Sequence, residues 1–277
     1  MRSILIAFCL ILGTTFGLPF KEYEIQKRIA GGDPATLGQI PFQVGVQTRK
    51  VTKGGDEYNS WCGGSLISDE WVLTAAHCLD GGKYAEIYLG VTNLANRDEP
   101  GRRLLKAPKE NLIVHENYIR NYVRNDIALV KLPERVVFNR KIKLPVNLPR
   151  RSQLSESFAE KVGWISGWGD LGDRKGSPKN LQFARRWILP NEHCNYLYHD
   201  FFQPKTQICV DGSNSIAACN GDSGGPLTVE EEDGTRTLVG CFSYFSSSCE
   251  NNTPVVYTRL TPFLDWVTEK TGIQLKD

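Results

Sequence analysis

Short apolar runs separated by turn residues constrain the fold of this chain more than any other feature. The runs "FQVGVQT", "WVLTAA", "AEIYLG" and "TLVGCFSYF" are rich in Val, Ile, Tyr and Phe, and clusters of Gly, Asn, Asp and Pro lie between them. Such runs are typical of strands in a barrel or sandwich. A helical pattern stands at the end, where Phe263, Trp266, Val267 and Lys270 recur at three- and four-residue spacing after Pro262. The sequence therefore predicts an all-β fold with one C-terminal helix.

The N-terminal segment "MRSILIAFCLILGTTFG", residues 1–17, has the layout of a cleaved secretory signal. Arg2 precedes an apolar run from Ile4 to Leu12, and small residues follow as far as Gly17. The run is too short to span a bilayer, and no later stretch approaches roughly 18 consecutive apolar residues. We therefore expect a secreted, extracellular product without a membrane partner.

The charge balance excludes a class of partners. Lys and Arg total 33 and Asp and Glu total 31; residues 1–28 hold four of the former and two of the latter, which leaves 29 of each. A balanced chain gives no electrostatic reason to expect nucleic acid as a partner.

The cysteines are interpreted in the context of an oxidising compartment. Of eight cysteines, Cys9 leaves with the signal, so seven remain and at least one is unpaired. No CxxC pair occurs, so we do not expect a structural zinc site. We expect no metal and no cofactor.

The segment "CNGDSGGPL", residues 219–227, contains a candidate nucleophile, Ser223. A serine hydroxyl reacts at neutral pH only when a base takes its proton, so partners are needed. The pattern G-x-S-x-G alone also fits α/β-hydrolases, but those place the histidine after the serine. All four histidines of this chain precede Ser223. The order histidine, aspartate, serine is filled by His77 in "LTAAHC", Asp126 in "NDIAL" and Ser223.

With these motifs in this order, the sequence resembles the chymotrypsin-like serine peptidase family. The likeness covers essentially all of residues 29–277, because "IAGG", "CGGSLIS", "SGWG" and "TPVVYTRL" also fall in the family's order. The resemblance implies two antiparallel six-stranded β-barrels and a C-terminal α-helix, with the active site between the barrels. It implies that His77 is the general base, that Asp126 orients it, and that the N–H groups of Gly221 and Ser223 form the oxyanion hole.

The resemblance also implies activation by proteolysis. Arg28 directly precedes Ile29 in "QKRIAGG", where the family is cut. Residues 18–28 are then an activation propeptide, and residues 29–277 are the peptidase domain. A trypsin-like protease is the expected activator, and the new α-amine of Ile29 is expected to pair with the carboxylate of Asp222.

The disulfide pairing follows from the same resemblance. The implied pairs are Cys62 with Cys78, Cys194 with Cys209, and Cys219 with Cys249. Cys241 is left over in an apolar run, where a free cysteine commonly behaves as a small buried hydrophobe.

The specificity pocket is also located by the resemblance. Ala217, with Ala218 beside it, matches the floor, and a floor without an acid argues against preference for Arg or Lys. The walls match "SYFSSSC", beginning at Ser243, and "TPVVY", with Phe245 and Val255 where glycines are usual. We expect an occluded apolar pocket, with three outcomes open: small aliphatic preference, aromatic or Leu preference, or very weak activity.

The favoured hypothesis is a serine endopeptidase that acts on protein or peptide substrates and is open to protein inhibitors. The alternative is a catalytically weak or inactive homologue that acts as a binding protein.

Overall fold

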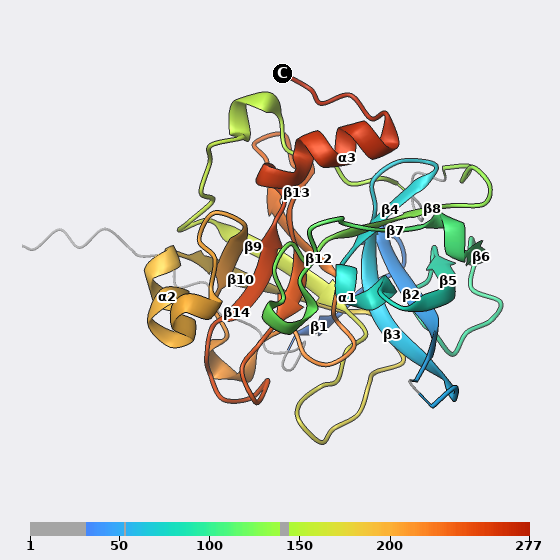
Figure 1. Ribbon diagram of the computed structural model, residues 1–277, viewed down its shortest axis with the longest axis horizontal. Coiled ribbons are helices and arrows are strands. Elements are labelled where there is room, and N and C mark those ends of the chain that lie inside the picture. Colours follow the sequence, from blue (N-terminus) through green and yellow to red (C-terminus); the bar gives the residue numbers. More distant parts are fainter. Residues whose placement is uncertain (1–31, 53, 139–143) are drawn as a thin grey trace, which may run out of the picture.

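The computed structural model describes residues 32–52, 54–138 and 144–277. The expected signal, the propeptide and the Arg28–Ile29 bond lie outside the described residues. Figure 1 shows two β-sheets side by side, the first coloured blue to green and the second mainly yellow to red. This division matches the two curled barrels that the resemblance implies.

The first sheet is built from seven antiparallel strands. Their spatial order is β6 (Arg103–Pro108), β5 (Gly82–Leu89), β2 (Gln43–Val51), β3 (Glu57–Leu66), β4 (Trp71–Thr74), β8 (Ala128–Lys131) and β7 (Leu112–Val114). The prediction of six strands differs by one because the 3₁₀ turn Lys109–Asn111 divides a single path into β6 and β7.

The second sheet also contains seven strands and closes on itself. Its order is β1 (Asp33–Pro34), β10 (Gln182–Leu189), β11 (Gln207–Val210), β14 (Val255–Arg259), β13 (Arg236–Tyr244), β12 (Pro226–Glu230) and β9 (Val162–Gly167). Strand β9 pairs with β10 as well as with β12, which closes a ring of six strands. The two-residue β1 adds to β10 as the seventh.

Three α-helices accompany the sheets in the described part of the chain: α1 (Ala76–Leu79), α2 (Asn191–Tyr198) and α3 (Leu264–Thr271). The C-terminal helix α3 confirms the predicted pattern, and Pro262 lies in the 3₁₀ turn just before it. Helix α2 was not predicted from the sequence. It buries only Cys194, so it carries no apolar stripe that could reveal it.

The two halves meet where the candidate site residues gather. The core of the first sheet includes Val44 and Val46 and extends to Leu264 and Val267 of α3, which crosses one end of the molecule (Figure 1). At the junction, the N–H of Gly63 in β3 donates to the carbonyl of Ser223 over 2.7 Å. The loop that carries Ser223 is thereby held against the first sheet.

Candidate active site

His77 and Asp126 are in direct contact. The turn α1 carries His77, and the segment before β8 carries Asp126, which is fully buried. His77 Nδ1 lies 2.8 Å from Asp126 Oδ2, and the backbone N–H of His77 donates to Oδ1 over 2.9 Å. Because Nδ1 faces a carboxylate, it takes the donor role and leaves Nε2 as the proton acceptor.

Asp126 is fixed by residues of the second sheet. Ser243 in β13 donates from Oγ to Asp126 Oδ2 over 2.6 Å. Thr258 in β14 donates to the backbone carbonyl of Asp126 over 2.8 Å. The resemblance placed Ser243 in a pocket wall. The structure adds a hydrogen bond to Asp126 that the sequence did not reveal.

Lys50 is a neighbour of the candidate base that sequence reasoning missed. It lies in β2 with 8% of its surface exposed, and its Nζ donates to the backbone carbonyl of His77 over 2.7 Å. Burial lowers the pKa of Lys50 below its usual range. Lysines are mostly exposed, so no sequence signal marks this one as a support for α1.

Glycines allow the Ser223 loop to approach the first sheet closely. Gly221 and Gly224 have φ angles of +93° and +76°, which favour glycine. A Cβ on Gly224 would lie 2.1 Å from Thr74 Oγ1 and 2.7 Å from the Gly63 carbonyl. Glycine is thus required at position 224 by the limited space beside β3 and β4.

Ser223 is half-buried, and its backbone carbonyl lies 3.6 Å from Cys78 Sγ, next in sequence to His77. Within the described residues, no hydrogen bond joins the Ser223 hydroxyl to His77. Such bonds are often long in ligand-free sites and shorten in complexes. The N–H groups of Gly221 and Ser223 also donate to no other described residue, so both are available to an external acceptor.

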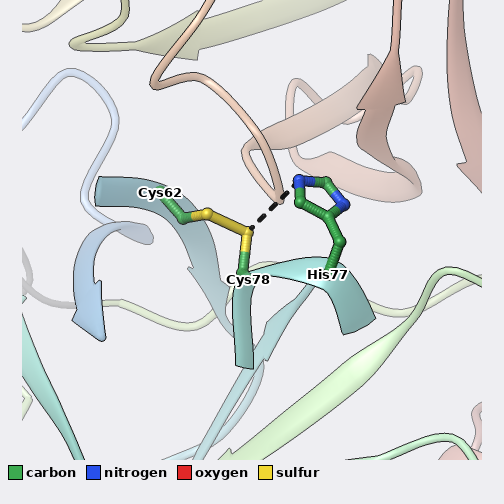
Figure 2. A group of neighbouring side chains, drawn as sticks. All are labelled: Cys62, His77 and Cys78. Atoms are coloured by element: carbon green, nitrogen blue, oxygen red, sulfur yellow. Dashed lines mark hydrogen bonds between the residues drawn. A yellow bond between two sulfur atoms is a disulfide. The ribbon is translucent and has the colours of Figure 1, made fainter. Parts of the chain in front are cut away.

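The Cys62–Cys78 disulfide packs beside the His77 ring. Figure 2 shows the bridge, with Cys78 Sγ 3.8 Å from His77 Nε2. These three side chains are close enough to resemble a metal site, but both cysteines are bonded to each other and offer no thiolate. The geometry therefore describes a structural bridge that fixes the turn carrying His77.

The other cysteines are arranged as the resemblance implies. Bridges join Cys194 to Cys209 and Cys219 to Cys249. Cys241 is free and buried, and burial raises the pKa of its thiol well above the usual range. Its Sγ lies 3.8 Å from the Asp126 carbonyl, so it packs behind the site as a small apolar side chain.

Asp222 is a buried carboxyl adjacent to Ser223. Its two oxygens accept from the N–H groups of Gly169, over 2.7 Å, and Cys219, over 3.0 Å. Burial raises the pKa of Asp222 to about 7 in spite of these two bonds. Ile29, its expected partner, lies outside the described residues.

The residues expected to form the pocket come together in the core of the second sheet. Ala217, Ala218 and Val255 are buried in one apolar cluster, and the half-buried Phe245 packs against it. The rings of Phe245 and Phe242 are stacked with centroids 6.3 Å apart. The two alanines and the Phe245 ring therefore give this cluster an apolar surface.

Comparisons with known proteins agree with this arrangement. Residues 29–267 match the family model described as Trypsin. The chain is 35% identical to chymotrypsin-C of Rattus norvegicus over 96% of this chain and 97% of that protein. It is 32% identical to a collagenase of Hypoderma lineatum over 98% of this chain and 99% of that protein.

A solved structure has a similar fold. The structure of HL collagenase aligns with a TM-score of 0.77 and 30% identity, covering 88% of this chain and 99% of that one. None of the helices in the described residues has the length and apolar character needed to cross a membrane.

Proposed function

The chain belongs to the chymotrypsin-like family of serine endopeptidases, and we propose that it is a secreted member that cuts peptide bonds with His77, Asp126 and Ser223 after activation at Arg28. The observation that carries the proposal is the buried Asp126 carboxylate bonded to His77 Nδ1, with Ser243 as a second donor. Three disulfides fit the oxidising compartment that a signal at residues 1–17 implies.

In the proposed reaction, Ser223 Oγ attacks the carbonyl carbon of the scissile peptide bond while His77 Nε2 takes its proton. His77 then gives that proton to the leaving amine, and water repeats the sequence to release the acyl group. The N–H groups of Gly221 and Ser223 stabilise the oxyanion. Removing one such donor typically costs about 10²–10³ in rate.

Activation is proposed to depend on Asp222. A carboxylate buried beside Ser223 is unfavourable without a positive partner, and its raised pKa reflects this cost. Cleavage after Arg28 by a trypsin-like protease would release the α-amine of Ile29, which pairs with Asp222. The pair stabilises the loop 219–223 in the form that presents both oxyanion donors.

A serine-directed fluorophosphonate tests the proposal against the alternative of a non-catalytic binding protein. We expect covalent labelling at Ser223 after trypsin cuts at Arg28, and little labelling of an Arg28→Gln variant treated in the same way. An unlabelled cut chain with a native fold would favour the binding protein. Equal labelling of the uncut variant would refute the zymogen account.

The proposed chemistry predicts a bell-shaped pH profile for kcat/KM of the cut chain. Activity should fall at acid pH because protonated His77 cannot accept the Ser223 proton. It should fall at alkaline pH as the Ile29 amine, which titrates near 8 when free and higher when paired, loses its charge opposite Asp222. Peptide hydrolysis between pH 5 and 10 measures both limbs.

The matched control for the acid limb is His193→Gln, because His193 is exposed on α2. This variant should keep the wild-type profile. A rate that does not fall on the acid side would contradict the role of His77.

The occluded pocket predicts a change of specificity on removal of its walls. Phe245→Gly combined with Val255→Gly should deepen the site and shift cleavage toward Phe, Tyr and Leu, by roughly 1–3 kcal/mol per extra group accommodated. Cleavage of a peptide library measures the shift. Thermal unfolding must accompany it, since Val255 is buried. A wild type that already prefers aromatic residues, with no change in the double variant, would exclude occlusion.

A further inference from the structure

A cavity beside the candidate active site is assigned no role by the proposed reaction. It has a volume of about 660 Å³. One side is formed by Arg124, and the other by residues at the end of α2 and in the loop after it: Asn195, His199, Asp200, Phe202, Gln203 and Pro204. Its volume falls in the range of cavities that take small molecules or several side chains.

Arg124 is the distinctive group of this cavity. Its Nε is buried without a hydrogen-bond partner among the described residues. Ion pairs to carboxylates are formed by other described arginines, namely Arg49, Arg103, Arg120, Arg135, Arg151 and Arg186, but not by Arg124. The guanidinium lies over the Tyr122 ring, 5.4 Å from its centroid. A buried donor on a charged group is costly unless a partner satisfies it.

Arg124 places this cavity close to Asp126 of the candidate active site. Arg124 is two residues before Asp126, so their Cα atoms are within about 7 Å of each other. The buried Gln207 ties both sides of the cavity together: its Nε2 donates to the Val123 carbonyl over 3.4 Å, and its Oε1 accepts from the N–H of Gln203 over 2.7 Å.

The same Gln207 connects the cavity to β13, the strand that carries Ser243. Its Oε1 also accepts from the Tyr244 hydroxyl over 3.1 Å. Tyr244 lies between Ser243, which contacts Asp126, and Phe245 of the pocket wall. Under the proposed function, a peptide whose side chain reaches the Phe245 wall would therefore lie next to a segment that contacts this cavity through Gln207.

The chemistry of the lining indicates the ligand. The planar guanidinium of Arg124 matches the two oxygens of a carboxylate. Asp200 on the opposite side adds a negative charge, which disfavours polyanions such as phosphate or sulfate. The combination favours a single carboxylate on an otherwise neutral chain.

We propose that this cavity is a subsite for an acidic side chain, Asp or Glu, of a peptide substrate at a position away from the cleaved bond. The inference rests on the proposed peptidase function, because the ligand is part of the substrate. The peptidase would then prefer an acidic residue away from the cleaved bond, in addition to an apolar residue in the pocket lined by Phe245 and Val255.

A series of peptides with one cleaved bond and a single Glu or Gln placed in turn at each flanking position tests the subsite. For wild type, we expect kcat/KM to be about three- to tenfold higher with Glu than with Gln at one position, the range of a partly exposed ion pair. Arg124→Gln should remove this difference, so that the Glu and Gln peptides are cleaved with equal kcat/KM. Arg124→Glu should instead favour a Lys at that position.

The matched control is Lys205→Met, which removes an exposed positive charge next to Pro204 without changing the cavity lining. It should retain the preference for Glu. Absence of a Glu preference at every position, or its persistence in both Arg124 variants, would overturn the subsite. Failure of the wild type to cleave any neutral peptide would instead count against the proposed function.

Discussion

Replacing Ser223 by Ala should reduce kcat/KM of the cut chain by about 10⁶-fold, because the substitution removes the oxygen that we propose forms the acyl bond. The contacts that hold the loop in place do not involve the Ser223 side chain: the Ser223 carbonyl accepts from the Gly63 N–H, and the Asp222 carboxylate accepts from the N–H groups of Gly169 and Cys219. The fold should therefore survive the change. Hydrolysis of a peptide substrate and fluorophosphonate labelling measure the loss.

The control for this variant is Ser155→Ala, an exposed serine outside the site, in the turn that follows the 3₁₀ segment Arg151–Gln153. It should keep wild-type activity and labelling. If Ser223→Ala remained within tenfold of wild type while folded, another residue would have to be the nucleophile.

The parts of the structure that could be predicted from sequence are those encoded by local pattern or by motifs in order. The strand runs, including "AEIYLG", of which all but Gly90 lies in β5, and "TLVGCFSYF" across β13, correspond to strands because strand-forming residues and the turn residues between them act locally. The helix α3 followed from its apolar spacing. The order of the motifs also predicted that His77 and Asp126 lie close together, and the structure shows them in contact.

Polar contacts between distant segments could not be predicted. Ser243 and Asp126 are 117 residues apart, and Lys50 and His77 are 27 residues apart, yet both pairs are joined by hydrogen bonds. No local pattern encodes such a bond, since it depends on how two sheets pack. The cavity at Arg124 could not be predicted for the same reason. Its two sides come from segments about 70 residues apart in sequence, which Gln207 joins.

Asp126→Asn should reduce kcat/KM by about 10⁴-fold at neutral pH, although the side chain keeps its size. Asp126 accepts from three donors: His77 N–H, His77 Nδ1 and the Ser243 hydroxyl. An asparagine offers one carbonyl oxygen and one NH₂ group in place of two acceptor oxygens. If its oxygen faces the His77 N–H, its NH₂ faces Nδ1, which must then become an acceptor.

That arrangement moves the imidazole proton to Nε2, the atom that must take the proton of Ser223. Loss of activity therefore arises from the wrong tautomer and not from unfolding. The thermal midpoint should stay close to that of the wild type while kcat/KM falls. Ser243→Ala is the matched comparison, because it removes one donor and leaves both histidine contacts in place. It should cost only about tenfold, as expected for a single hydrogen bond to a charged group. Activity of Asp126→Asn within tenfold of wild type would show that Asp126 does not set the tautomer of His77.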